Sequence, residues 1–150
     1  MDYILNLREK VGHAPLILTG GTLLALNKNN ELLMMRRTDN QCWGVPGGMM
    51  EPGETLEQTA IRETKEEIGI CPEHLELFGV YSGPELFYVY PNGDQVFNVS
   101  VVFICREISG EIELNKEEHN EFHFFPLNNL PENISPPVVT IIRDLVNKYN

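Results

Sequence analysis

The sequence predicts an α+β fold in which helices cover a mixed or antiparallel β-sheet. Apolar runs of strand length alternate with polar turns over most of the chain, and segments with helical spacing stand between and after them. The chain has 150 residues, of which 42% are hydrophobic and 22% charged. This is the size and composition of one globular domain, so we expect residues 1–150 to form a single domain.

The first elements are predicted to be a short helix and a hairpin. Apolar residues recur at helical spacing over residues 2–11, just before Gly12. Two apolar runs, 16–27 and 31–36, then flank the polar turn Lys28-Asn29-Asn30. This pattern predicts two strands joined at a hairpin tip.

A second helix is predicted over residues 55–68. Thr55 and Gln58 form a capping box at its start, and Gly69 follows its last turn. Just upstream, Glu51-Pro52-Gly53-Glu54 has Pro and Gly at the two central positions that a type II turn favours. The helix is therefore expected to follow a rigid loop.

Strands are predicted over most of the second half of the chain. Residues rich in aromatic and branched side chains predict strands over 75–81, 85–90, 95–107 and 121–125. Asn92-Gly93 lies between the second and third of these strands and predicts a hairpin turn. Ser135-Pro136 opens a last helix with an apolar stripe. The stripe consists of Val138, Ile141, Ile142 and Leu145.

Charge and composition restrict the partners. The formal charge is −11, from 22 acidic and 11 basic residues, which argues against long nucleic acid as a partner. A small anionic substrate remains compatible, because bound divalent cations can invert the field of an acidic cleft. The sequence shows no secretion signal and no apolar run long enough for a membrane span. The three cysteines, Cys42, Cys71 and Cys105, form no Cys-x-x-Cys pair, so we expect a reducing cytoplasm.

Three glutamates share one face of the predicted helix 55–68, namely Glu63, Glu66 and Glu67. Like charges at this spacing destabilise a helix by about 0.2–0.5 kcal/mol per pair, and a bound cation reverses that sign. Mg²⁺ prefers oxygen ligands and suits such a face, although a solvated acidic surface is the alternative interpretation. Arg62 lies four residues before Glu66 and can pair with it or with Gln58.

The loop before this helix strengthens the prediction of a metal site. In Val45-Pro46-Gly47-Gly48, two glycines after a proline let the backbone approach a ligand and turn a carbonyl toward it. A simple tight turn is the alternative.

Loop and helix together resemble the Nudix box of the Nudix hydrolases, the MutT-like pyrophosphohydrolases. The resemblance is carried by Gly48, by Glu54 after five further residues, and by the run Arg62–Ile70 after seven more. Every fixed position matches, and Thr64 stands where the family prefers an aliphatic residue. Similarity to the family plan extends over residues 16–132. It implies the Nudix-type α/β/α sandwich with a mixed β-sheet.

The resemblance also implies ligands for a catalytic ion. Glu66 and Glu67 are expected to bind Mg²⁺, or Mn²⁺, together with the carbonyl of Gly47. Glu63 is expected to bind metal or to orient the attacking water, and Arg62 to brace the glutamates. The remaining matches are expected to support the structure: Glu54, Gly48 and Gly69.

A carboxylate is expected to take the proton from the attacking water. Glu63 is the first candidate. The resemblance also points to an acid outside the box, where Glu117, Glu118 and Glu121 lie, and Glu118 is favoured among these. The alternative is that residues 111–121 form a solvated acidic stretch.

Substrate contacts are expected from the strand before the glycine loop. Arg36 or Arg37 can bind a substrate phosphate with two parallel hydrogen bonds, and strand alternation sends the other one elsewhere. Trp43 is expected to pack in the core rather than stack on a base. Phe87, Tyr88 and Tyr90 are alternative stacking surfaces, with packing against the sheet as the default.

A zinc site is not predicted. His119 and His123 have the spacing of zinc ligands on a helix, but the strand expected from Glu121 breaks that geometry.

The function implied by the resemblance is Mg²⁺-dependent hydrolysis of a pyrophosphate bond in a nucleoside diphosphate linked to another group. ADP-ribose or a nucleotide sugar is the first expectation; an oxidised or ordinary nucleoside triphosphate and a dinucleoside polyphosphate are alternatives. A nucleotide-binding regulator without turnover is less favoured, because all three box glutamates are present. Related proteins often form homodimers, and the N-terminal helix or an edge strand could supply the contact surface.

Overall fold

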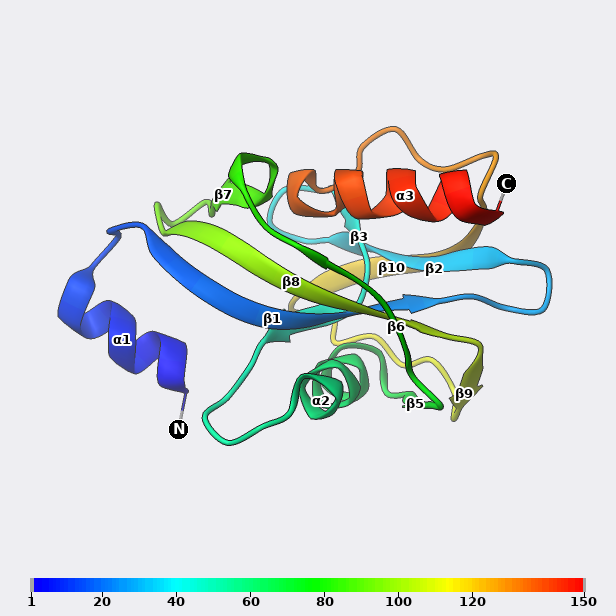
Figure 1. The fold of residues 1–150 in the computed structure, drawn as a ribbon, viewed down its shortest axis with the longest axis horizontal. Helices are drawn as coiled ribbons and strands as arrows, with labels where there is room; N and C mark the ends of the chain where they lie inside the picture. Colours follow the sequence, from blue (N-terminus) through cyan, green and yellow to red (C-terminus); the bar gives the residue numbers. More distant parts are fainter. Residues whose placement is uncertain (1, 150) are drawn as a thin grey trace.

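A layer of β-strands lies between two helices in the computed structural model, which describes residues 2–149. Helix α2 (Leu56–Ile68) covers one side of the layer and helix α3 (Val139–Tyr149) covers the other (Figure 1). The predicted α+β class and the α/β/α sandwich are confirmed. A third helix, α1 (Tyr3–Val11), lies beyond the N-terminal end of β1 (Figure 1).

The main sheet is mixed. Its strands are ordered β4-β1-β8-β6, and β7 also pairs with β8. Strands β1 and β8 run parallel over ten residue pairs, whereas the other pairs are antiparallel. The bounds are β1 Leu16–Ala25, β4 Gly47–Met49, β6 Glu76–Tyr81, β7 Phe87–Val89 and β8 Gln95–Cys105.

A second sheet carries part of the candidate site. It has the order β10-β2-β3, with both pairs antiparallel. Its bounds are β2 Glu31–Arg37, β3 Trp43–Gly44 and β10 His119–Pro126. A separate antiparallel pair joins β5 (Cys71–Glu73) to β9 (Glu107–Ser109).

Each helix covers its own hydrophobic cluster. On the α3 side, Ile141, Ile142 and Leu145 pack against apolar residues of β1, β2 and β8, which confirms the predicted stripe. On the α2 side, Ala60 packs close to Gly21 of β1. A Cβ atom at Gly21 would lie 2.8 Å from the carbonyl oxygen of Leu56, so only glycine allows this approach.

The boundaries of α2 follow from local sequence. Thr55 and Gln58 form both hydrogen bonds of the predicted capping box, and Gly69 ends the helix in the left-handed conformation with φ 74°. In the preceding turn the amide of Glu54 donates to the carbonyl of Glu51, and Gly53 has φ 89°. The predicted turn before the helix is confirmed.

Three boundaries differ from the prediction. The strands predicted over 16–27 and 31–36 do not form a regular hairpin; they enter different sheets and share one bridge, between Leu26 and Leu32. Within the strand predicted over 85–90, Pro84–Leu86 is a 3₁₀ turn and only Phe87–Val89 is extended. The strand predicted over 95–107 is interrupted at Arg106, so β8 ends at Cys105.

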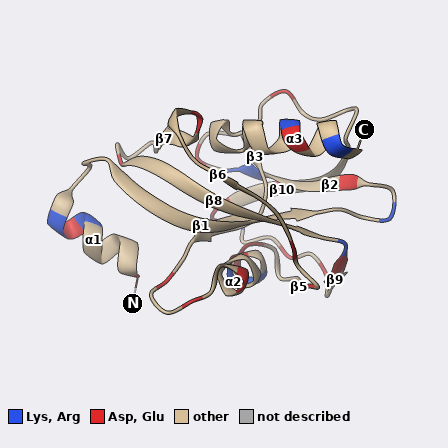
Figure 2. Cartoon of the chain, viewed as in Figure 1, with Lys and Arg blue, Asp and Glu red and all other residues tan. Residues whose placement is uncertain are grey.

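Trp43 packs as predicted, edge-on against Phe125 with ring centroids 4.9 Å apart, beside the α3 cluster. Charged side chains lie outside β1 and β8, which are uncharged along their whole length (Figure 2). Within residues 2–149, the helices are too short or too polar to cross a membrane.

Candidate active site

Glu67 lies in the last turn of α2 and is the most deeply buried acid of the box. Its side chain is 6% exposed. The Gly47 amide donates a 3.2 Å hydrogen bond to Glu67 Oε1. The glycine loop and the acidic helix therefore meet at this carboxylate, as the sequence predicts.

The other two glutamates of the box lie at different depths. The Glu63 side chain is 20% exposed, and its carboxylate lies directly over Gly48. The Glu66 side chain is 59% exposed and lies 3.4 Å from an Arg62 nitrogen. Glu63 and Glu67 therefore form the inner part of the acidic face, and Glu66 its outer part.

Arg62 connects the acidic helix to the loop that precedes it. Its guanidinium donates to Glu54 Oε2 at 2.6 Å and to Glu54 Oε1 at 2.9 Å. It also donates to Glu63 at 2.9 Å and to the Met49 carbonyl at 3.1 Å. These contacts are the ones expected of an arginine that braces the glutamates, and the hydrogen bonds from Arg62 lower the pKa of Glu54 to about 2.

The departure at Thr64 is accommodated locally. Its side chain is fully buried, and its hydroxyl donates to the Ala60 carbonyl at 2.7 Å. The buried polar group is therefore satisfied within the helix.

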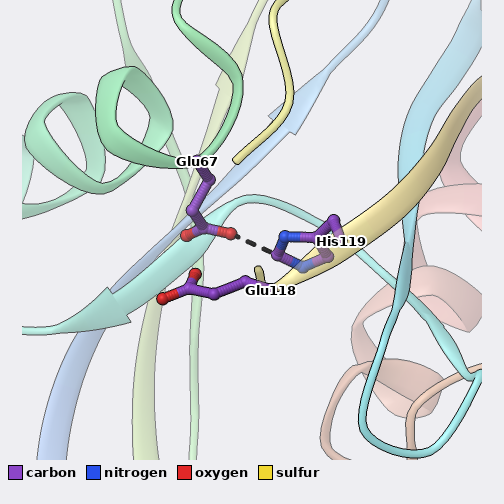
Figure 3. Close-up of side chains that lie close together, drawn as sticks. All are labelled: Glu67, Glu118 and His119. Atoms are coloured by element: carbon purple, nitrogen blue, oxygen red, sulfur yellow. Dashed lines mark ion pairs between the residues drawn. The ribbon is translucent and has the colours of Figure 1, made fainter. Parts of the chain in front are cut away.

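A loop that follows β9 brings two further groups to Glu67. The Asn115 amide donates to the Glu67 carbonyl, and the His119 amide donates to the Asn115 carbonyl. Glu118 and His119 consequently point toward Glu67 from the start of β10 (Figure 3). Ligand atoms of these three residues lie within 4.8 Å of one another and could hold a metal ion.

The charges of this cluster fit a cation. Burial raises the pKa of Glu67 well above its ordinary value, and the nearby Glu63 and Glu118 carboxylates raise it further, whereas the Gly47 hydrogen bond lowers it. Burial also raises the pKa of Glu63, against the effect of Arg62. Carboxylates held together in this way repel one another, and a divalent ion would reverse that repulsion.

Arg36 and Arg37 diverge, as strand alternation predicts. Arg37 lines the cleft with Glu67 and His119, and donates two hydrogen bonds to Asp39 at 2.9 and 2.7 Å. Arg36 instead pairs with Glu121 at 3.0 Å. Arg37 is therefore the arginine whose position suits a substrate phosphate.

A cleft beside Glu67 lies against the main sheet. Tyr88, Tyr90, Asn98 and Ser100 line it together with Glu67. The two tyrosine rings meet edge to face, with centroids 4.9 Å apart. Phe87, the third aromatic residue predicted as a stacking surface, packs against Phe97 instead. Residues of α2, β7 and β8 therefore share one cleft.

Sequence reasoning missed two groups at this cleft. The sequence spacing points to His119 only as a zinc ligand together with His123, and strand β10 separates that pair. Its place beside Glu67 depends on the path of a distant loop. Asn98 is buried in β8 and donates to the Leu86 carbonyl at 3.0 Å. A polar asparagine within a largely apolar strand is the feature of the sequence that could have pointed to Asn98.

These features define a known class of protein. The sequence pattern of the NUDIX domain matches residues 19–145. The chain belongs to the NUDIX domain family.

Two curated relatives illustrate the similarity. The ADP-ribose pyrophosphatase of Methanocaldococcus jannaschii is 40% identical over 110 residues, which are 71% of this chain and 61% of that protein. The 8-oxo-dGTP diphosphatase of Escherichia coli is 40% identical over 70 residues, or 44% of this chain and 50% of that protein. The chain therefore aligns with about half to three fifths of the length of these relatives.

A solved structure supports the fold. The crystal structure of a MutT NUDIX hydrolase from Burkholderia pseudomallei superposes with a TM-score of 0.72, at 24% sequence identity. The match covers 90% of this chain and 99% of the other.

The raised pKa of Glu67 predicts a pH effect on the metal-free protein. Because the pKa is higher in the folded than in the unfolded chain, protonation of Glu67 stabilises the fold below its ordinary value of 4.5, and this contribution is lost as the pH rises through the folded value. Burial lowers the pKa of the neighbouring His119 to about 4, and this group acts in the opposite direction in the same pH range, so the wild-type protein must be compared with Glu67→Gln. With a chelator present, raising the pH from 5 to 8 should change the urea-unfolding free energy less favourably in the wild type than in Glu67→Gln; identical pH profiles would contradict this explanation.

Gly48→Ala is expected to displace Glu63 without unfolding the protein. A Cβ atom at this position would lie 2.5 and 2.7 Å from the two carboxylate oxygens of Glu63. Since a flexible side chain can move away, the free energy of unfolding should change by less than about 1 kcal/mol. Turnover should fall by about a hundredfold, because the displaced carboxylate no longer faces the cleft. Steady-state kinetics with urea unfolding would check both, and wild-type turnover would contradict the expectation.

Proposed function

We propose that this protein is a pyrophosphohydrolase that uses Mg²⁺, or Mn²⁺, to hydrolyse a nucleoside diphosphate linked to another group. The observation that supports this most is the carboxylate cluster of Glu63, Glu67 and Glu118, which lines an acidic pocket that shares Glu67 with the neighbouring cleft. Phosphoryl chemistry needs mainly positioning and stabilisation of charge, which such a site can supply. A bound divalent ion would neutralise charge on the phosphate oxygens and lower the pKa of a coordinated water.

The ligands proposed for the ion are Glu63, Glu66, Glu67 and the Gly47 carbonyl. Glu67 is held by the Gly47 amide, so that one carboxylate oxygen has a fixed position. Glu66 is more exposed and lies on the outer side of the same helix face. Arg62 orients Glu63 through a hydrogen bond and ties the helix to its loop.

Glu63 is proposed as the base that takes a proton from the attacking water. Burial raises its pKa, which favours proton acceptance by this carboxylate nearer to neutral pH. Glu118 is the second candidate, because it shares the acidic pocket with Glu63 and Glu67.

ADP-ribose or a nucleotide sugar is the proposed substrate class. The name of the Methanocaldococcus relative supports ADP-ribose. Arg37 could donate to a phosphate, while Tyr88 and Tyr90 offer aromatic surfaces farther along the same cleft. The charge of −11 supports a small substrate rather than long nucleic acid.

An oxidised nucleoside triphosphate is the second candidate, supported by the name of the Escherichia coli relative. A substrate panel with product analysis tests both. Release of AMP and ribose 5-phosphate from ADP-ribose would support the first. Release of pyrophosphate from a nucleoside triphosphate, without cleavage of ADP-ribose, would support the second. Nucleotide binding without cleavage of any compound would indicate a regulator instead.

A further inference from the structure

His119 lies beside the carboxylates of the proposed metal centre, and the mechanism above gives it no role. Glu67, Glu118 and His119 each offer one ligand atom, all within 4.8 Å of one another (Figure 3). We propose that His119 supplies a nitrogen ligand to the metal ion, so that the centre favours first-row transition ions over Mg²⁺. The inference rests on the proposed metal-dependent function.

His119 is a buried polar side chain that hydrogen bonding does not explain. Its side chain is 6% exposed. Among residues 2–149, its Nδ1 atom has no hydrogen-bond partner. Burying such an atom costs about 1–3 kcal/mol, and native proteins usually avoid this cost. A metal bond at Nε2 would not satisfy Nδ1, but it would give this buried imidazole a function that apolar packing does not.

The distance between His119 Nε2 and Glu67 Oε2 is that of two ligands of one metal ion and not that of a hydrogen-bond donor and its acceptor. His119 Nε2 lies 3.8 Å from Glu67 Oε2, which is too long for a hydrogen bond. Two atoms that bind one ion, each at about 2.1 Å, lie roughly 3–4 Å apart. Nε2 is therefore the nitrogen to which we assign the metal bond.

The backbone holds both groups in place. The Gly47 amide occupies Glu67 Oε1, which leaves Oε2 as the oxygen nearest to His119. The His119 amide is bonded to the Asn115 carbonyl, and the Asn115 amide to the Glu67 carbonyl. His119 also faces Arg37 across the β2–β10 pair. Imidazole and carboxylate are thus joined through a short backbone connection.

The charge of the pocket favours a cation at this point. Acidic side chains surround His119, and Arg37 is already paired with Asp39. Mg²⁺ prefers oxygen ligands, whereas imidazole raises affinity mainly for transition ions. Mn²⁺ is the weakest binder of the first-row series, so a nitrogen bond to Mn²⁺ is a strict test of the proposal.

Pulsed electron paramagnetic resonance of Mn²⁺ bound to the full chain, without substrate, tests the nitrogen bond directly. The expected spin-echo modulation is that of ¹⁴N, and it should change to that of ¹⁵N when the protein contains ¹⁵N-labelled histidine. It should disappear in His119→Gln. His123→Gln is the matched control, since His123 lies exposed on the same strand, and this variant should keep the signal.

Absence of nitrogen modulation in the wild-type protein would overturn the proposal, as would its persistence in His119→Gln. Where His119→Gln does not fold, labelled His74→Gln keeps the test decisive, because Glu73, His74 and Glu107 form the other described cluster that could hold an ion. Retention of the ¹⁵N modulation in this variant is expected, and its loss would overturn the proposal. Calorimetric titration should also show Mn²⁺ affinity reduced by about tenfold or more in His119→Gln, with a smaller change for Mg²⁺.

These measurements are independent of hydrolysis, so the two proposals can fail separately. Hydrolysis without nitrogen modulation would leave the proposed function and remove the His119 ligand. Nitrogen modulation without hydrolysis of any substrate would leave the ligand and remove the function.

Discussion

Glu67→Gln is expected to reduce turnover by about a thousandfold or more, which is the largest effect of any single substitution considered. Glutamine retains an oxygen that can accept the 3.2 Å hydrogen bond from the Gly47 amide. It removes, however, the carboxylate that accepts from the Gly47 amide and lies 3.8 Å from His119. Steady-state kinetics at saturating Mg²⁺ would measure the loss, and circular dichroism would confirm that the fold is retained.

Glu67→Gln should lose turnover without losing stability in the absence of metal. A buried carboxylate with a raised pKa is a cost to the metal-free fold, so Glu67→Gln should not lower the free energy of unfolding measured with a chelator. The thermal stabilisation produced by added Mg²⁺ should decrease. Glu57→Gln, an exposed acid on the same helix, should leave turnover and metal stabilisation unchanged. Unfolding of Glu67→Gln without metal would contradict this account.

Arg62→Ala is expected to lower both stability and turnover. Removal of the guanidinium leaves the Glu54 and Glu63 carboxylates without their main partner and the Met49 carbonyl without a donor. We expect a loss of about 2–3 kcal/mol in the free energy of unfolding, given that the side chain is only partly exposed. Turnover should fall by about a hundredfold, because Glu63 loses its orientation. Urea unfolding and steady-state kinetics would measure the two effects.

Two controls separate the geometry of Arg62 from its charge. Arg62→Lys keeps the charge but not the forked donor, so its stability should be intermediate. Arg143→Ala removes an exposed arginine that lies 4.0 Å from Glu85, and it should cost less than about 1 kcal/mol. Equal stability of Arg62→Ala and Arg143→Ala would contradict the bracing role.

Local patterns predicted the acidic helix well. The capping box at Thr55, the terminal Gly69 and the spacing of Glu63 and Glu67 all depend on residues within one or two helical turns. Such local features require only that the helix itself forms, and not any particular contact with the rest of the fold. The sequence could therefore predict the part of the site that lies on α2.

Long-range pairing was not predictable in the same way. Strand β1 pairs with β8, from Leu16 with Val96 onward, and not with the strand that follows it in sequence. The predicted hairpin tip forms, with Leu26 bridging to Leu32, but the strands do not pair beyond it, because a polar turn indicates a chain reversal and does not fix which edges form hydrogen bonds. Alternation separated Arg36 from Arg37, but the register with β10 decides which one faces the cleft.

His119 shows the same limit within the site. Its position beside Glu67 depends on the hydrogen bonds of Asn115, in a loop that joins two distant elements. No pattern around His119 in the sequence indicates this contact.

Hydrolysis of ADP-ribose by the purified chain tests the central claim most directly. The reaction should be run with Mg²⁺, with Mn²⁺ and with a chelator, and its products identified by mass spectrometry. We expect AMP and ribose 5-phosphate in equal amounts, formed only with a divalent ion and nearly abolished in Glu67→Gln. Failure to cleave ADP-ribose or any other compound in a broad nucleotide panel would contradict the central claim, as would cleavage that the chelator leaves unchanged.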